Sequence, residues 1–258
     1  MIRAYLFALD PTGAQAEMFR SHCGAQRYAY NFGLALVRAN LDQRAAERSY
    51  GVTGDQLTPP VSWSAYGLRK IWNEAKDERA PWWAVNSKEA YSSGLASLAA
   101  ALSDWSASAS GKRAGRKVAF PRFKSRRSPL TCRFTTGAFG LGEDRRHIRL
   151  PRIGLVRTHE PTRKLARRVD NGTARIRSVT LSWQRGRWHV SFSVELPDPR
   201  HLDATLTVLR RAQRRCSRRR GPDRRTRTVA SNRWRKATAR VAALHTRVAN
   251  ARRDGLHK

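Results

Sequence analysis

The acidic residues of this chain are too few and too scattered to predict a metal-dependent nuclease centre. Such a centre needs clustered carboxylates that hold two metal ions about 4 Å apart, activate water and stabilise the leaving oxygen. Glu74, Asp77 and Glu78 share one predicted helix with lysines and arginines, which is typical of a solvated, salt-bridged face. Glu195 falls on the polar side of a predicted strand, and Asp198 lies between two prolines. We therefore predict no catalytic residue and no metal ligand in this chain.

Histidine and cysteine spacing indicates no other catalytic or metal-binding motif. The seven histidines have neither H-x-x-x-H nor H-E-x-x-H spacing, and the three cysteines lie far apart without a C-x-x-C pair. The chain contains no G-x-S-x-G, Walker or Rossmann pattern. Isolated cysteines argue against a disulfide framework and fit a reducing cytosol. No cofactor is expected.

The cationic residues carry a much stronger signal. The chain has 258 residues, with 52 Lys and Arg against 19 Asp and Glu, which gives a formal net charge of +33. A generally basic proteome would explain part of this excess, but its clustering after residue 200 favours a nucleic-acid partner. No predicted helix has the wide apolar face that inserts into a membrane surface, and no apolar run approaches the roughly 20 residues of a spanning helix. We expect no membrane partner.

Residues 115–127, with the sequence GRKVAFPRFKSRR, interleave cations with aromatic rings. Cations neutralise phosphates, and the candidates here are Lys117, Arg122, Lys124 and Arg126. Phe120 and Phe123 can either accept bases or anchor the segment in a core, and the sequence leaves both interpretations open. Trp63, at the edge of a predicted loop, is a further candidate to contact DNA.

A second basic segment, residues 210–220, places arginine on nearly every face of a predicted helix. A buried helix would not tolerate this pattern. The segment is therefore either solvated or laid along a phosphate backbone, and we favour the second interpretation. Its predicted nucleic-acid contacts are Arg214, Arg218 and Arg219.

The first half of the chain is predicted as one strand followed by helices. Residues 2–9 alternate as in a strand, and Thr12 with Gln15 three residues later forms a capping-box pattern. Gly24 interrupts the helical pattern that follows, so we predict two helices before residue 49. Helical patterns resume at about residues 62–76 and 86–108, which completes a predicted four-helix region.

From residue 110 to Leu196 the signals are those of strands. Short strands are predicted at residues 131–137, 145–151 and 153–159, followed by a hairpin. In the hairpin, apolar residues alternate with polar ones on both sides of a turn at residues 184–187, which predicts one buried face. Several short strands with glycine-containing turns predict a small barrel or sandwich.

The last predicted strand passes through two prolines directly into a basic helix, in the sequence VSFSVELPDPRHLDATL. Further along, apolar residues recur at alternating spacings of three and four from Trp234 to Val248, which predicts a helix–helix seam. We therefore expect a basic helical hairpin over residues 202–254.

Several of these stretches together resemble the TnpB proteins of insertion sequences, a transposase-associated family related to type V CRISPR effectors. The segment LDPTGAQAEMFRSHCGAQRYAYNFGLALVR is similar to the opening of the family, with Gln15, Arg27 and Asn31 among its motif positions. FPRFKSRR followed by RFTT is similar to its central motif, and IRLPRIGLVR to a pair of barrel strands. The segments LRRAQRRCSRRR and SNRWRKATARVAALHTRVANARRDGLHK resemble a helical hairpin of its nuclease domain.

The resemblance implies an α+β fold: a split, wedge-like β-barrel with an inserted helical bundle, followed by a basic helical hairpin left from a RuvC-like domain. Residues 1–11 would be the first barrel strand, and residues 12–109 a helical recognition bundle with a helix-turn-helix-like start. Residues 110–197 would complete the barrel, and residues 198–258 would be the remnant of the nuclease domain.

The resemblance also implies partners and contacts. Members of the family bind a guide RNA, recognise a short target-adjacent motif in double-stranded DNA and cut DNA at a magnesium-dependent site of three carboxylates. We therefore expect guide RNA and double-stranded DNA as partners, and a cytoplasmic, nucleoid-associated location. By their positions in the motifs, the contacts with the target-adjacent duplex would be Trp63, Ser87, Lys88, Tyr91, Thr131 and Thr135. Arg122, Lys124 and Arg133 would face backbone phosphates.

The chain departs from the family where catalysis would begin. The family carries its first catalytic Asp on a strand with the pattern G-[IV]-D-x-G directly after the barrel, but here Leu196-Pro197 runs straight into Asp198-Pro199. The catalytic Glu, the zinc ribbon and the last catalytic Asp would be expected beyond residue 258. We therefore expect a truncated TnpB-like protein that binds nucleic acid, uses neither magnesium nor zinc and does not cleave DNA on its own.

Three alternatives stay open from the sequence. The chain could be an active RNA-guided endonuclease whose missing parts are supplied by another chain or were lost in gene prediction. It could be a non-functional relic, basic but without specificity. It could also be a sequence-specific DNA-binding repressor that acts without RNA, although residues 27–38 are too apolar to lie along a major groove.

Overall fold

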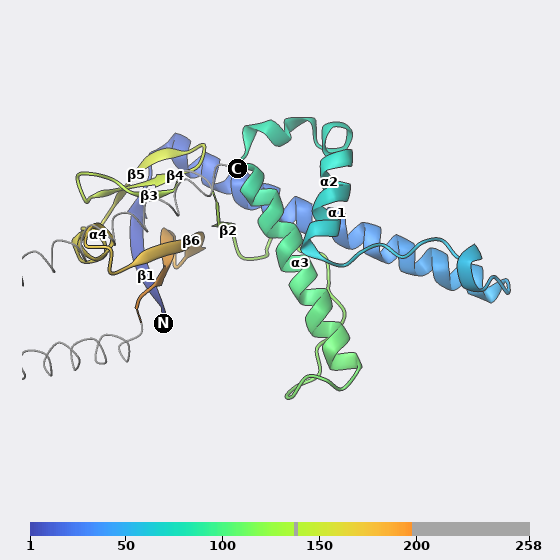
Figure 1. Ribbon diagram of the computed structural model, residues 1–258. Helices are drawn as coiled ribbons and strands as arrows, with labels where there is room; N and C mark the ends of the chain where they lie inside the picture. The colour runs from blue at the N-terminus through green and yellow to red at the C-terminus, as the bar shows by residue number, and fades with distance from the viewer. Residues whose placement is uncertain (137–138, 198–258) are drawn as a thin grey trace, which may run out of the picture. The chain divides into compact units, whose positions relative to one another are not determined.

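The computed structural model describes residues 1–136 and 139–197, which contain four α-helices and seven strands (Figure 1). All strand pairings are antiparallel. The mixed α and β composition expected from the sequence is confirmed. The predicted helical hairpin at residues 202–254 lies outside the described residues.

Helix α1 runs without interruption from Gly13 to Ser49. Its capping box is confirmed: the amide of Gln15 donates to the Thr12 hydroxyl at 3.3 Å, and the Gln15 side chain accepts from the Thr12 amide at 3.1 Å. The prediction of two helices before residue 49 is wrong, because α1 continues through Gly24. A glycine inside a helix costs only about 1 kcal/mol relative to alanine, and the packing of α1 offsets this cost at Gly24.

Two further helices complete the helical region, so the described residues contain three long helices where the sequence predicted four. Helix α2 spans Ala65–Arg79 and helix α3 spans Lys88–Ala109, close to their predicted ranges. Each begins at a serine cap: the Ser64 hydroxyl accepts from the Gly67 amide, and the Ser87 hydroxyl accepts from the Glu89 amide. Short 3-10 turns at Gly54–Gln56 and Pro81–Val85 lie in the connections.

The seven strands form one sheet in the order β2-β6-β7-β1-β5-β4-β3. They are β1 (Ile2–Asp10), β2 (Thr131–Phe134), β3 (Gly140–Leu141), β4 (His147–Leu150), β5 (Gly154–Thr158), β6 (Arg175–Gln184) and β7 (Arg187–Glu195). Strand β1 joins the two halves of the sheet, because its residues 2–8 pair with β7 and its residues 9–10 pair with β5. The end strands β2 and β3 do not pair with each other in the described residues. The sheet is therefore open, and the closure of the predicted barrel is not confirmed.

The predicted hairpin is confirmed as β6 and β7. Its two loop residues, Arg185 and Gly186, both have positive φ, as a tight two-residue hairpin turn requires. The alternating residues Trp188, Val190, Phe192 and Val194 are all buried on one face. Trp183 has the same alternation but lies at the end of the hairpin, where it is 39% exposed and contacts the Trp188 ring.

Helix α4 (Arg163–Asp170), between β5 and β6, was not predicted from the sequence. It has only eight residues, which is too few for a helical period to stand out. Leu165 and Ala166 face the protein interior and Val169 packs against the core, whereas most of the charged residues are exposed, so tertiary packing of a few apolar side chains holds this helix in place.

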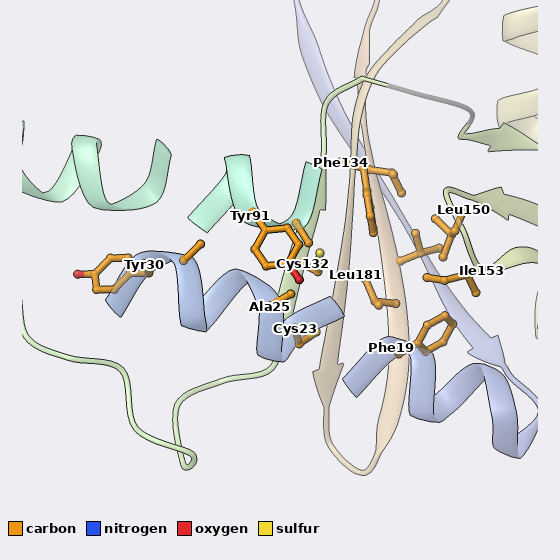
Figure 2. Packing of buried hydrophobic residues seen from close by; sticks show 14 of the residues in the cluster. Phe19, Cys23, Ala25, Tyr30, Tyr91, Cys132, Phe134, Leu150, Ile153 and Leu181 are labelled. Atoms are coloured by element: carbon orange, nitrogen blue, oxygen red, sulfur yellow. The ribbon is translucent and has the colours of Figure 1, made fainter. Parts of the chain in front are cut away.

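The helices and the sheet share one hydrophobic core (Figure 2). Phe19 and Cys23 of α1 and Tyr91 of α3 lie beside side chains of the sheet such as Phe134 and Leu181. Residues Met1–Asp198 form one compact unit. The helical part and the sheet are thus positioned by common packing, which fixes the elements that carry the candidate site.

Candidate nucleic-acid interface

The basic segment, defined as residues 116–127, is tied to α1 by side chains that bond to its main chain. Asn31 makes two such bonds with Lys124, since its side-chain oxygen accepts from the Lys124 amide at 2.8 Å and its nitrogen donates to the Lys124 carbonyl at 2.9 Å. These residues are 93 positions apart in the chain. One side chain thereby satisfies both polar groups of a residue that has no regular secondary structure.

Two arginines of α1 extend this attachment. Arg27 donates to the carbonyls of Ser125 and Arg126 at 3.4 and 3.5 Å, and Arg38 donates to the carbonyl of Pro121 at 3.3 Å. Arg27, Asn31 and Arg38 are spaced by four and seven residues, so they lie on one face of the helix. The main chain of the basic segment is therefore held along α1 at three points.

The aromatic rings of the basic segment have different surroundings. Phe120 is partly buried and packs edge-on against Trp105 of α3, with ring centroids 5.0 Å apart. Phe123 is 49% exposed. The Arg38 guanidinium lies 5.6 Å from the Phe120 centroid and 5.1 Å from the Phe123 centroid, within cation–π range of both. Phe120 is thus an anchor of the segment, whereas Phe123 keeps much of its surface free.

Lys124 points toward an aromatic ring of α1. Its ammonium lies 4.1 Å from the centroid of Tyr30, and burial lowers the pKa of the Lys124 side chain. A predicted phosphate contact at this residue has to compete with the Tyr30 ring for the ammonium. The contact stays a prediction.

The other predicted cations of the basic segment face solvent. Lys117, Arg122, Arg126 and the adjacent Arg127 are exposed, and no ion pair within residues 1–136 and 139–197 includes any of them. Their charges are not neutralised by neighbouring carboxylates. The main-chain contacts with α1 therefore present uncompensated cations from a fixed backbone.

The predicted contacts on β2 lie at the junction with α1 and α3. Arg133 is exposed; its amide donates to the Gln26 side chain at 3.1 Å and its guanidinium to the Ser178 hydroxyl at 3.1 Å. Thr131, at the start of the strand, is partly buried. The Thr135 amide and hydroxyl both donate to one oxygen of Glu89, at 3.0 and 2.8 Å.

Glu89 connects the start of α3 to the end of β2. The same carboxylate oxygen also accepts from the Thr136 amide at 3.0 Å. Burial raises the pKa of Glu89, but the hydrogen bonds from Thr135 and Thr136 outweigh it and hold the pKa below its usual value. The ionised carboxylate is therefore the form that fixes this turn.

Two of the predicted contact residues are buried in this structure. The Ser87 amide donates to Nε2 of His22 at 3.1 Å, and its hydroxyl caps α3. Tyr91 is 1% exposed and stacks on Trp72 with centroids 4.9 Å apart. Both side chains act here as capping and packing groups, while the adjacent Lys88 is exposed.

Trp63 lies at the other end of α3. It is partly buried against Trp105, with centroids 5.9 Å apart, and lines a cleft of about 470 Å³. The cleft also contains Ser64, Ser103, Ser106, Ser110 and Lys112. Nineteen residues of helix separate Ser87 from Ser106, which is about 28 Å. The predicted contacts therefore form separate groups along α3 and do not converge on one point.

Sequence reasoning missed the side chains that position this surface. Arg27 and Asn31 are recognisable as motif positions, but their partners in the basic segment are about a hundred residues away. The only local signal for Arg38 is that it lies on the same helix face. Arg214, Arg218 and Arg219 lie outside the described residues.

The described residues contain no group of three or more His, Cys, Asp or Glu side chains that could hold a metal ion. Among them there is also no helix long and apolar enough to cross a membrane.

Comparisons with known proteins support a family assignment. The family model HTH_OrfB_IS605, described as a helix-turn-helix domain, matches residues 1–45, which here form β1 and most of the uninterrupted α1. The Mycobacterium tuberculosis protein Rv2885c, named as a candidate RNA-guided DNA endonuclease, is 32% identical over 99% of this chain. InsQ of Escherichia coli, with the same designation, is 27% identical over 100% of this chain.

The chain spans 62% of the length of each of these two relatives. Their similarity extends across both the helical region and the sheet, and it agrees with the motifs from which the resemblance was drawn. These similarities support the identification of the chain as a member of the TnpB family of insertion-sequence proteins.

Proposed function

We propose that this chain binds nucleic acid through the basic segment and the neighbouring end of β2, with guide RNA and target-adjacent duplex DNA as its partners. The observation that carries the proposal is the pair of hydrogen bonds between Asn31 and Lys124, which fixes a segment whose other cations are exposed and form no ion pair with the described residues. The names of the relatives as candidate RNA-guided DNA endonucleases support the choice of partners.

A fixed backbone makes such a segment a better ligand for phosphates. Binding normally costs the freedom of loops and long side chains that become ordered at the interface. Here the main chain of residues 121–126 is already held by α1, so only the side chains of residues such as Arg122 and Arg126 lose freedom. Each phosphate that they neutralise releases counterions and makes the affinity depend on salt.

A salt titration tests this proposal. The triple variant Arg122→Gln, Arg126→Gln, Arg127→Gln should reduce the slope of log affinity against log salt by about 0.9 for each lost duplex contact. RNA transcribed from the region beside the gene should be preferred over random RNA at high salt. An unchanged slope in the triple variant would contradict the proposal. An equal loss of affinity for the two RNAs with increasing salt would also contradict it.

We also propose that the chain does not cleave DNA on its own. Strand β7 ends at Glu195 and is followed at once by Leu196-Pro197-Asp198-Pro199, where the family pattern has a strand with a catalytic Asp. The test is incubation with magnesium, the RNA from beside the gene and a target duplex. A cut that depends on that RNA would refute the proposal and favour an active endonuclease.

A further inference from the structure

Helix α4 presents a stripe of cations on its exposed face. Leu165 is fully buried on the inner side of the helix, whereas Arg163, Lys164 and Arg167 are exposed. Residues three and four apart lie next to one another on a helix surface, so these three side chains form one continuous patch. We call this patch the α4 stripe.

The charge of the α4 stripe is not compensated locally. The one acidic residue of the helix, Asp170, is bonded to Arg145 at 3.1 Å. No ion pair in the part of the chain that the structure describes includes a residue of the stripe.

Two cations of the stripe also occupy an unfavourable end of the helix. Arg163 and Lys164 lie in the first turn, which has no acidic residue and no side-chain cap. The hydroxyl of Thr162, which could cap the helix, donates instead to the Arg145 carbonyl at 3.0 Å. The N-terminus of a helix carries partial positive charge, so cations there oppose the helix dipole. Residues that lower the stability of their own helix or strand are expected at functional sites.

Helix α2 shows what a merely solvated helix looks like in the same protein. Its surface mixes the exposed cations Arg69, Lys70 and Arg79 and the partly buried Lys76 with the exposed acids Glu74, Asp77 and Glu78. The alternation of signs lets neighbouring charges screen one another. The single sign of the α4 stripe is therefore not a general property of the helices of this basic chain.

We propose that the α4 stripe binds the phosphodiester backbone of a nucleic acid, as a contact separate from the basic segment. The proposal rests on the proposed function only in taking nucleic acid as the partner. The stripe contains no exposed apolar side chain that could insert into a lipid surface, which favours nucleic acid over a membrane. Its three cations are suited to phosphate groups, which position a protein on a nucleic acid but carry no sequence information.

The two contacts are attached to different parts of the fold. Helix α4 is bonded at Thr162 to the turn before β4, while the basic segment is bonded to Arg27, Asn31 and Arg38. Gln15 of α1 donates to the Leu155 carbonyl of β5 at 2.8 Å, and sixteen residues of helix, about 24 Å, separate it from Asn31. Figure 1 shows α4 beside the half of the sheet that contains β3, β4 and β5.

The experiment compares two charge-matched variants of the full chain. The first carries Arg163→Gln, Lys164→Gln and Arg167→Gln in α4. The control carries Arg69→Gln, Lys70→Gln and Arg79→Gln in α2, which removes the same number of charges. Binding to a random-sequence DNA duplex and to an RNA duplex of the same sequence is measured between about 50 and 200 mM salt.

The α4 variant should lower the magnitude of the salt slope by about 2 to 3, because each lost phosphate contact contributes about 0.9. The control should leave the slope unchanged. The melting temperature of the α4 variant should equal or exceed that of the wild type, because the substitutions remove cations that oppose the helix dipole. The duplex for which the salt slope changes more, RNA or DNA, identifies the nucleic acid that the α4 stripe binds.

Three results would overturn the proposal. Equal slope changes in the two variants would show that only overall charge matters. An unchanged slope in the α4 variant, together with a reduced slope in the Arg122, Arg126 and Arg127 variant, would reject the α4 contact and leave the proposed function standing. Loss of binding to phosphatidylserine vesicles, with duplex binding intact, would assign the stripe to a membrane.

Discussion

Helix α1 has two neighbours that it holds in opposite ways. Against α3 it packs through apolar side chains and a glycine, with Gly94 so close that an added Cβ would lie 2.2 Å from the Gln26 carbonyl oxygen. Along the basic segment Arg27, Asn31 and Arg38 form hydrogen bonds with the main chain of residues that are mostly exposed. The first contact is needed for stability, and the second is suited to presenting cations. Substitutions on the two sides should therefore separate folding from binding.

Gly94→Ala should give the largest loss of stability. The new methyl group would meet the main chain of α1, which cannot move aside as a flexible side chain can, and we expect a destabilisation of about 3 kcal/mol or more. Gly24→Ala is the matched control, because a Cβ at Gly24 would meet nothing within 4 Å and alanine favours the helix by about 1 kcal/mol. Chemical denaturation of both variants measures the difference. Equal stability of the two would show that α1 and α3 do not pack this closely.

Asn31→Ala should leave the fold largely intact and weaken binding. It removes both bonds to Lys124, for which we expect about 1 to 2 kcal/mol of stability and a loss of affinity at low salt as the basic segment becomes mobile. Asn31→Asp keeps the acceptor for the Lys124 amide and loses the donor to its carbonyl, so it should be intermediate. Cleavage by trypsin after Arg122 and Arg126 should accelerate in the same order. If Asn31→Ala binds nucleic acid with wild-type affinity, the attachment of the basic segment to α1 does not contribute to binding.

The same contrast explains what the sequence could and could not predict. The β6–β7 hairpin followed directly from alternation, because its buried residues are neighbours in the pattern and its turn contains Gly186. The break predicted at Gly24 was wrong because the packing of α1 outweighs the small cost of one glycine. Helix α4 was missed because it is short, so its two buried residues leave too little of a period to detect.

For the candidate site, the chemistry of the residues was readable and their positions were not. The cations of the basic segment stand out as a run, but Asn31 and Glu89 act on residues that are 93 and 46 positions away. No local pattern contains such a pair. Positions taken from the family resemblance did not reveal burial either, since Ser87 and Tyr91 lie in the core while Lys88 between them is exposed.

Glu89→Gln should weaken the connection between α3 and β2 with a smaller effect, about 1 kcal/mol, because the amide oxygen can still accept one of the three hydrogen bonds. The pKa of Glu89 is lower in the folded protein than in the unfolded chain, so its contribution is present above the ordinary value of 4.5 and is lost as the pH falls below it. Denaturation between pH 7 and acid conditions should show a stability loss in the wild type that is smaller in Glu89→Gln. Identical pH profiles of the wild type and Glu89→Gln would show that the Glu89 carboxylate does not stabilise the connection between α3 and β2.

His22 tests the α3 side of the comparison by pH alone, because its effect is absent at neutral pH. Nδ1 of the buried imidazole donates to the Met18 carbonyl at 2.8 Å, so Nε2 must be unprotonated to accept from the Ser87 amide. Burial lowers the pKa of His22, and the charge of Arg152 acts in the same direction. The unfolded chain therefore binds a proton more readily than the folded protein does.

The free energy of unfolding should have its full value above the ordinary His pKa of 6.5. Below that pH it should decrease, by at most about 1.4 kcal/mol per pH unit. His22→Gln should flatten this part of the profile. Because the basic segment is bonded to α1 and not to Ser87, binding measured between pH 6 and 8 should change less than stability does.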